Sequence, residues 1–456
     1  MRNGGLPLAQ KIVVRGGRPL KGRVRVSGAK NAALAILCGA ILAEEPIILD
    51  NIPKISDVQH IIQMITYLGA RVVWRKEDVL SVSVSTLKAK KAPYELVKKL
   101  RASNLLLGPV LARCGEAHIP LPGGCNIGLR PMDLHFKGLR ALGAELSIEK
   151  GYIRARAPRL RGTQIYLDFP SVGATENIMM AACLAEGQTL IENAAKEPEV
   201  VDLANFLNGI GARIFGAGTD VIRIEGVKEL GRQIYYTVIP DRIEAGTFMV
   251  AAAAAGGKVR IEGVIPRHVQ PLTAKLRETG VEVVEGEDVL YVKRTGELRP
   301  VNVKTMPYPG FPTDMQSQVI ALLSIASGTS VVVENIYENR FQVTQELRRM
   351  GAKVKVEGRA AIVEGVPQLF GAQVRATDLR AGAALVIAGL IAQEETEVSG
   401  AELIYRGYKD FESKLAGLGA EIRSVNPAGD KDLAFERKKV ITKAGIFRGT
   451  SNNSIT

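Results

Sequence analysis

Positively charged side chains stand at the predicted starts of helices that are apolar on nearly every side. The cations are Lys30, Arg101 and Arg380. A helix N-terminus already carries unpaired N–H groups and the positive end of the helix dipole, so a cation there is unfavourable unless an anion binds beside it. Arginine can also hold an oxyanion through two hydrogen bonds. The pattern therefore indicates a site for phosphate or carboxylate groups.

Polar residues at the same helix starts have a second explanation. Ser27, Ser171, Thr313 and Asp378 are residue types that cap helix N-termini by accepting a backbone hydrogen bond. For these residues, capping and ligand binding both remain open. Capping does not account for the cations.

A long loop with an unusual cysteine lies in the second quarter of the chain. The stretch PGGCNIGLRPMDLH, residues 122–135, contains three glycines and two prolines, and long loops in compact repeats are often functional. Cys125 lies among the glycines and near Arg130 in the sequence. A thiol there could have a lowered pKa and act as an acid or a nucleophile, although most single cysteines are structural.

The elements that must position these residues form a repeat. Six times, about 70 residues apart, an apolar helix is followed by a strand, a more polar helix, a glycine turn and a short strand, and a closing strand then completes the unit in all but the sixth. Glycine just past a helix end adopts positive φ without a Cβ clash. The turn glycines are Gly69, Gly143, Gly211, Gly280, Gly351 and Gly419. The repeat predicts an α/β fold with buried helices.

The ends of the repeat predict the domain boundaries. The sixth unit has no clear closing strand after residue 425, whereas the N-terminal stretch KIVVRGGRPLKG matches the closing strand of other units. We therefore expect the N-terminus to complete the last unit. One domain would span 22–236 and carry the Cys125 loop. The other would combine 1–21 with 237–425 and carry Asp314, Arg380 and Arg406. We expect 426–456, which has no repeat character, to be a flexible tail.

Composition excludes some classes of protein and leaves others open. No segment has the length and hydrophobicity of a transmembrane helix, and four cysteines in 456 residues do not suggest a disulfide framework. The N-terminus lacks the pattern of a signal peptide, so we expect a cytoplasmic protein. The net charge of +13 is spread along the chain and fits either nucleic acid or small anionic substrates. A metal site fits no common ligand spacing, and we expect none; the residues considered were Cys114, His118, Cys125 and His135.

Ten motifs occur in the order found in UDP-N-acetylglucosamine enolpyruvyl transferases, which this chain resembles over about residues 11–425. They are GAKNAAL, LRASN, GGCNIGLRPMDLH, PSVGATEN, ENAAKEPEVVDLANFL, PDRIEAGTF, FPTDMQ, ENRF, DLRAGAALV and RGY. The resemblance implies two domains, each an inside-out α/β barrel of three β-α-β-α-β-β units with the helices inside. It also implies the first committed step of peptidoglycan synthesis: the 3-hydroxyl of UDP-N-acetylglucosamine attacks C2 of phosphoenolpyruvate, and phosphate leaves. No metal or organic cofactor is implied.

The resemblance assigns a role to each matched residue. Cys125 corresponds to a general acid at C3 of phosphoenolpyruvate that the epoxide fosfomycin alkylates, and Asp314 to the base for the sugar hydroxyl. Asn31 would orient the reacting centre. The phosphate of phosphoenolpyruvate would be held by Lys30, Arg130 and Arg406, and its carboxylate by Arg380 with Lys30 and Arg406. The UDP-sugar site would be lined by Arg101, Arg130, Pro131, Met132, Asp133, Leu134, Ser171, Val172, Gly173, Asp314 and Ile336.

Two other functions compete with this interpretation. The sister enzyme that uses shikimate 3-phosphate shares the fold and chemistry, but it lacks the loop cysteine. A nucleic-acid-binding repeat protein would need a basic groove with stacking aromatic side chains, and aromatic residues make up only 5% of the chain. We expect two small-molecule substrates, no nucleic-acid or membrane partner, and a monomer.

Overall fold

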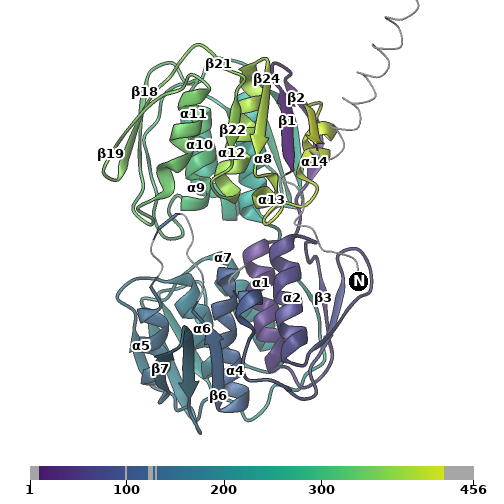
Figure 1. The fold of residues 1–456 in the computed structure, drawn as a ribbon, viewed down its shortest axis with the longest axis vertical. Coiled ribbons are helices and arrows are strands. Elements are labelled where there is room, and N and C mark those ends of the chain that lie inside the picture. The colour runs from purple at the N-terminus through teal and green to yellow at the C-terminus, as the bar shows by residue number, and fades with distance from the viewer. Residues whose placement is uncertain (1–9, 98–99, 122–126, 129–130, 426–456) are drawn as a thin grey trace, which may run out of the picture.

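The computed structural model describes residues 10–97, 100–121, 127–128 and 131–425. Buried apolar side chains form two separate clusters. One runs from Ala29 to Val238, and the other joins Ile12–Val26 to Ile243–Ala420. We call these the first and second lobes; they are stacked along the long axis of the molecule (Figure 1). No helix among the described residues is long and apolar enough to cross a membrane.

The first lobe contains three sheets around its helices. In sheet order, the strands are β13 (Tyr235–Thr237), β3 (Ile47–Asp50), β5 (Leu80–Ser83) and β4 (Arg71–Trp74); β6 (Glu116–Pro120), β8 (Tyr152–Arg156) and β7 (Glu145–Glu149); and β11 (Arg213–Phe215), β12 (Val221–Glu225), β10 (Gln188–Glu192) and β9 (Gln164–Tyr166). The helices are α1 (Lys30–Gly39), η1 (Ala40–Leu42), α2 (Ser56–Leu68), α3 (Tyr94–Val97), η2 (Arg101–Leu106), α4 (Leu107–Cys114), α5 (Asp133–Ala141), α6 (Val172–Ala182) and α7 (Pro198–Gly209).

The second lobe repeats this arrangement and adds one short strand pair. In sheet order, the strands are β15 (Glu282–Glu285), β16 (Val289–Arg294), β14 (Gly257–Glu262) and β2 (Leu20–Arg25); β17 (Val303–Lys304), β18 (Thr329–Val333), β20 (Ala360–Glu364) and β19 (Lys353–Glu357); β22 (Gln373–Arg375), β24 (Glu395–Ser399), β1 (Lys11–Arg15) and β25 (Glu421–Val425); and the pair β21 (Leu369–Phe370) and β23 (Ala392–Gln393). The helices are α8 (Arg242–Ala255), η3 (Pro266–Val269), α9 (Gln270–Glu278), η4 (Thr313–Met315), α10 (Gln316–Leu323), η5 (Arg340–Gln342), α11 (Val343–Arg349), α12 (Leu379–Ile391), α13 (Ala401–Ile404) and α14 (Phe411–Gly417).

The four-stranded sheets share one pairing pattern. An edge strand runs parallel to its neighbour, and the next two strands follow antiparallel, as in β9, β10, β12 and β11. In the last of these sheets, β1 lies between β24 and β25 and pairs antiparallel with both. The N-terminal strand thus lies within the sheet of the last unit.

The repeated turns and the buried helices also follow the sequence. All six turn glycines have positive φ, between 90° and 122°. The Ala-rich helices lie inside the lobes: every residue of α10 is buried, as are all residues of α8 after its first except Ala255. Small side chains let these helices pack closely against one another and against the sheets.

Two adjacent segments carry the chain between the lobes. Ala29 N donates to Ile239 O at 2.7 Å, and Asp241 N donates to Ser27 O at 2.9 Å. Only glycine fits at position 28, because a Cβ there would lie 1.7 Å from the backbone oxygen of Asn51. The predicted first boundary differs from the structure: residue 22 lies inside β2, which pairs with β14 of the second lobe, so the chain enters the first lobe only after Val26.

Candidate active site

Asp314 is held by two buried arginines in the second lobe. Arg340 Nη2 donates to Asp314 Oδ1 at 2.7 Å, and Arg380 donates to Oδ2 through Nε at 3.2 Å and Nη2 at 3.1 Å. Burial would raise the pKa of the Asp314 carboxyl, but Arg340, Arg380 and Lys30 outweigh it and hold this pKa well below its ordinary value. Asp314 is therefore ionised at neutral pH.

The start of α12 fixes Arg380. Asp378 caps this helix, accepting from Arg380 N at 2.8 Å and Ala381 N at 3.0 Å. The guanidinium lies 5.2 Å from the centre of the Tyr408 ring, and the Tyr408 hydroxyl is within 2.9 Å of Thr247 Oγ1. Because Arg380 is only 1% exposed, an anion that binds it must be buried in the protein as well.

A second carboxylate joins cations from both lobes. Asp57, at the start of α2, accepts from Lys30 Nζ at 3.4 Å and from Arg406 Nε at 2.9 Å. Lys30 begins α1 of the first lobe, and Arg406 follows α13 of the second. The backbone N–H of Lys30 also donates to Asp241 Oδ2 at 3.0 Å. For Lys30 and Arg380, the anions expected at the helix starts are thus protein carboxylates in this structure.

The two groups form one charged cluster around Lys30. Burial lowers the pKa of the Lys30 ammonium, Asp57 and Asp314 act to raise it, and Arg380 and Arg406 act to lower it. The side chains also lie close together: a Cβ on Gly407, which follows Arg406, would lie 3.6 Å from Arg380 Nη1 and 3.7 Å from Lys30 Cδ. The structure therefore brings together four predicted residues, which are Lys30, Asp314, Arg380 and Arg406.

Of the four residues that could cap helix N-termini, two do so in the structure and two make other contacts. Ser171 caps α6, accepting from Ala174 N at 3.3 Å, and Asp378 caps α12. Ser27 instead accepts a hydrogen bond from Lys414 Nζ at 2.7 Å, and α1 has no side-chain cap. Thr313 donates its hydroxyl hydrogen to Glu334 Oε2 at 2.9 Å and accepts from Arg340 Nη1 at 3.2 Å.

Most residues predicted to line the UDP-sugar site lie at two neighbouring helix starts of the first lobe. The buried His135 of α5 joins them: a Cβ on Gly173 would lie 3.3 Å from its Cε1, and its Nδ1 is 3.0 Å from Asn177 Nδ2 of α6. Pro131 and Met132 precede α5, and Asp133 and Leu134 begin it. Ser171 is the N-cap of α6, and Val172 and Gly173 begin that helix.

The remaining predicted residues are more scattered. Asn31 is exposed in the first turn of α1, and Arg101 begins η2. Ile336 follows β18, and its N–H donates to Glu334 Oε1 at 2.8 Å. Cys125 and Arg130 lie outside the described residues.

The chain between Cys125 and Arg130 contacts the second lobe. Asn339 N donates to Ile127 O at 3.1 Å, and a Cβ on Gly128 would lie 2.7 Å from Glu338. Asn339 directly precedes Arg340, which holds Asp314. This contact brings Ile127 and Gly128 to the turn that carries Arg340.

Sequence reasoning missed Asp57 and Arg340. Arg340 stands in the motif ENRF, but neither its position nor its spacing predicts a role for it. Asp57 had no such signal, because an acidic residue in the first turn of a helix is ordinary. Its contacts with Lys30 and with Arg406, which is 349 positions away, distinguish it only in the folded protein.

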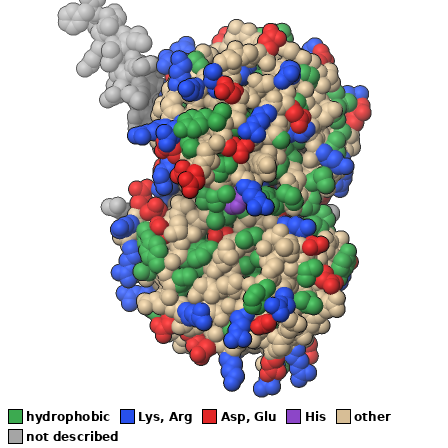
Figure 2. All heavy atoms as spheres, turned by 180° about the vertical axis from the view of Figure 1, so that it is seen from behind, with side chains coloured by type: hydrophobic (Ala, Val, Ile, Leu, Met, Phe, Trp, Pro, Cys, Tyr) green, Lys and Arg blue, Asp and Glu red, His purple; other side chains and the backbone are tan. Residues whose placement is uncertain are grey.

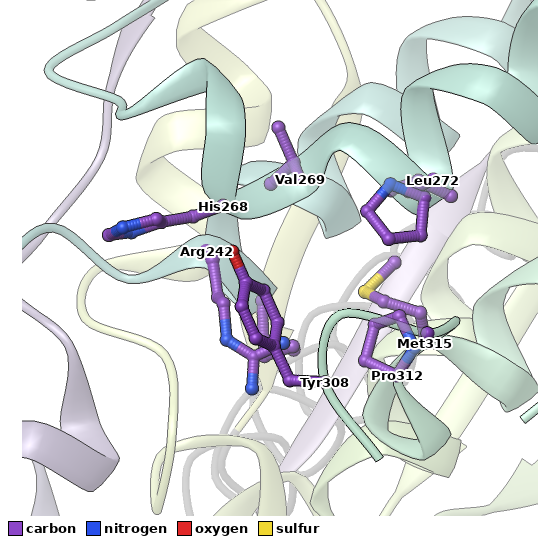
Figure 3. Close-up of a pocket in the computed structure, with 10 residues that line it drawn as sticks. Arg242, His268, Val269, Leu272, Tyr308, Pro312 and Met315 are labelled. Atoms are coloured by element: carbon purple, nitrogen blue, oxygen red, sulfur yellow. The ribbon is translucent and has the colours of Figure 1, made fainter. Parts of the chain in front are cut away.

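A small cavity beside η4 does not fit the substrates. It has a volume of about 10 Å³ and is lined by Pro312, Met315, Tyr308 and Arg242, among others (Figure 3). That volume is about one water molecule. Arg242 joins the lobes here, pairing through Nε with Glu199 Oε1 of α7 at 3.0 Å.

Comparisons with known proteins agree with the motifs. Residues 14–415 match the family model described as EPSP synthase (3-phosphoshikimate 1-carboxyvinyltransferase). The chain is 57% identical to UDP-N-acetylglucosamine 1-carboxyvinyltransferase 2 of Carboxydothermus hydrogenoformans, covering 91% of this chain and all of that one. It is 56% identical to UDP-N-acetylglucosamine 1-carboxyvinyltransferase 1 of Caldanaerobacter subterraneus, over 90% of this chain and 99% of the relative.

Solved structures show the same mixed α/β fold. The enolpyruvyl transferase NikO of Streptomyces tendae superposes with a TM-score of 0.83 at 27% identity, covering 92% of this chain and 99% of that one. EPSP synthase of Acinetobacter baumannii has a TM-score of 0.73 at 20% identity, over 91% of this chain and all of that one. From the sequence identity over nearly the whole repeat region and the shared fold, it follows that the chain belongs to the UDP-N-acetylglucosamine 1-carboxyvinyltransferases of the enolpyruvyl transferase family.

Proposed function

We propose that this protein transfers the enolpyruvyl group of phosphoenolpyruvate to the 3-hydroxyl of UDP-N-acetylglucosamine and releases phosphate. The observation that carries this proposal is the charged cluster at the junction of the lobes, where Lys30, Arg380 and Arg406 lie around the carboxylates of Asp57 and Asp314. Phosphoenolpyruvate carries one phosphate and one carboxylate, so it needs several fixed cations in a small space.

The chemistry proceeds by addition and elimination. Asp314 removes the proton of the sugar 3-hydroxyl, whose oxygen attacks C2, while Cys125 protonates C3. The resulting tetrahedral phospho-ketal then loses a proton from C3 and phosphate from C2, which restores the double bond. Lys30, Arg130 and Arg406 hold the phosphate. Arg380, with Lys30 and Arg406, holds the carboxylate, and Asn31 orients the reacting centre.

The arginine contacts of Asp314 bear on its role as a base. Two guanidiniums on one carboxylate lower its proton affinity. When the carboxylate of phosphoenolpyruvate takes Arg380, Asp314 loses one of these cations and its pKa rises. Substrate binding thus activates the base only when the electrophile is in place.

We also propose that each lobe is an inside-out barrel of three β-α-β-α-β-β units. The shared sheet pattern and the buried helices of both lobes support this. The lobes would be two domains that meet at the paired segments around Gly28 and Pro240 and close on the substrates, excluding water. The UDP-sugar would bind along the starts of α5 and α6, with Arg101, Asp314 and Ile336 completing its site.

The cellular setting follows from the proposed product. An enolpyruvyl UDP-sugar is a precursor of peptidoglycan, and the enzyme would act as a cytoplasmic monomer. On the face shown in Figure 2, basic and acidic side chains are intermixed over both lobes. A nucleic-acid-binding protein would be expected to gather its basic side chains into one stripe, so this face favours small anionic substrates.

One assay tests the function. Purified protein with phosphoenolpyruvate and UDP-N-acetylglucosamine should release phosphate in proportion to the sugar nucleotide consumed. With shikimate 3-phosphate in its place, release should stay at background. If phosphate is released with shikimate 3-phosphate but not with UDP-N-acetylglucosamine, the substrate assignment is wrong. If neither acceptor supports phosphate release, the proposed reaction is wrong.

Replacing Cys125 tests the general acid. Cys125→Ser should lower turnover about a hundredfold, because a hydroxyl donates a proton far less readily than a thiol, and should abolish inactivation by fosfomycin. Phosphate release with and without the epoxide measures both effects. Cys114→Ser is the matched control and should stay sensitive; retained sensitivity of Cys125→Ser would exclude Cys125 as the alkylated thiol.

A further inference from the structure

Asp57 lies between two of the cations proposed to hold the phosphate. It is 1% exposed, and its oxygens contact Lys30 Nζ at 3.4 Å and Arg406 Nε and Nη2 at 2.9 and 3.5 Å. A buried carboxylate in such a place either competes with the substrate anion or arranges the cations for it. These alternatives predict opposite effects of removing it.

The surroundings of Asp57 keep its carboxylate in place. Val58 and Ile61, which follow Asp57 in α2, are fully buried in the first lobe. The preceding Ser56 is joined to the second lobe, because its N–H and its hydroxyl both donate to Tyr405 O, at 3.2 and 3.3 Å. The backbone that carries the Asp57 carboxylate is therefore anchored in both lobes.

The cations differ from Asp57 in exposure. The side chain of Arg406 is 30% exposed and that of Lys30 is 11% exposed, against 1% for Asp57. Asp57 thus contacts both cations from their buried side. Their more exposed side is where a phosphate from solvent arrives.

On the basis of the proposed function, we propose that Asp57 is a positioning residue for phosphoenolpyruvate. Its carboxylate holds Lys30 of the first lobe and Arg406 of the second as a pair, so that the phosphate meets both cations already in place. Without it, the two like charges would repel each other and Arg406 would lose its link to the first lobe.

The pairing also has a consequence for pH dependence. The charged groups that act on Lys30 are Asp57, Asp314, Arg380 and Arg406, and Asp241 accepts its backbone N–H. Burial lowers the pKa of Lys30, and among these groups Asp57 opposes that shift most strongly. Removing its charge lowers the pKa further, so Lys30 loses its proton at a lower pH.

The test compares two buried interlobe carboxylates in the full-length protein. Asp57→Asn should lower kcat/KM for phosphoenolpyruvate about tenfold or more, since truncating one partner of a buried charge pair has effects of this order. It should also move the alkaline limb of that profile to lower pH, while titration calorimetry shows UDP-N-acetylglucosamine binding as in the wild type. Glu199→Gln is the matched control, because Glu199 is also buried and also pairs with an arginine of the other lobe.

The outcomes separate the possible roles. Glu199→Gln should leave the alkaline limb unmoved, and Asp57→Glu, which keeps the charge, should move it less than Asp57→Asn. Equal losses for both substrates, or the same pH profile in Asp57→Asn and Glu199→Gln, would overturn the positioning role. A higher affinity for phosphoenolpyruvate in Asp57→Asn would show that Asp57 competes with substrate. Absence of phosphate release by the wild type would instead refute the function itself.

Discussion

Asp314→Asn is expected to bind UDP-N-acetylglucosamine almost as the wild type does and to turn over about a thousandfold more slowly. A carboxylate that accepts a proton in the transition state contributes an effect of this order. Asparagine keeps the shape of the side chain and one oxygen acceptor for the arginines, but it cannot take up the proton. Calorimetric binding and single-turnover phosphate release measure the two effects separately.

A control must separate loss of the base from loss of charge. Glu334→Gln removes a nearby buried carboxylate that accepts from Thr313, next to Asp314. It should slow turnover far less than Asp314→Asn. Near-normal turnover of Asp314→Asn would remove its role as base, and similar losses in both variants would assign the effect to electrostatics around η4.

Lys30→Ala is expected to lower kcat/KM for phosphoenolpyruvate about a thousandfold, while UDP-N-acetylglucosamine binding stays close to wild type. Lys30 is a buried cation proposed to contact both anionic groups of phosphoenolpyruvate, and removing one preorganised donor from such a site costs this order of rate. The fold should survive, because Asp57 keeps its pairing with Arg406. Initial rates at varied phosphoenolpyruvate and saturating UDP-sugar measure the effect.

The charge and the shape of Lys30 can be tested apart. Lys30→Arg keeps a cation that cannot lose its proton, so its activity should persist further into alkaline pH than that of the wild type. Burial lowers the pKa of Lys30, so the lysine loses its proton, and with it phosphoenolpyruvate affinity, as pH rises through that lowered value. Equal loss of both substrates in Lys30→Ala would indicate a structural role instead.

Much of the fold could be predicted from the sequence because its helices, strands and turns follow from short-range sequence patterns. Glycine at a helix end, an apolar helix and alternating strands are short-range patterns, and six copies at a regular spacing confirm one another. Even the return of the N-terminal strand was predictable, since β1 resembles the closing strands of other units. The predicted first boundary lies too early in the chain. The sequence of β2 does not show which lobe this strand joins, and the structure pairs it with β14 of the second lobe.

The sequence by itself determined the family and the residue types at the helix starts, because motif order and local patterns are properties of the chain. Only the tertiary structure decided which charges meet. Arg406 lies 349 positions from Asp57, and Arg380 lies 66 positions from Asp314. Such pairs depend on how the two lobes and several helices pack. Burial then increases their interaction energy, because charges away from water interact more strongly than exposed ones.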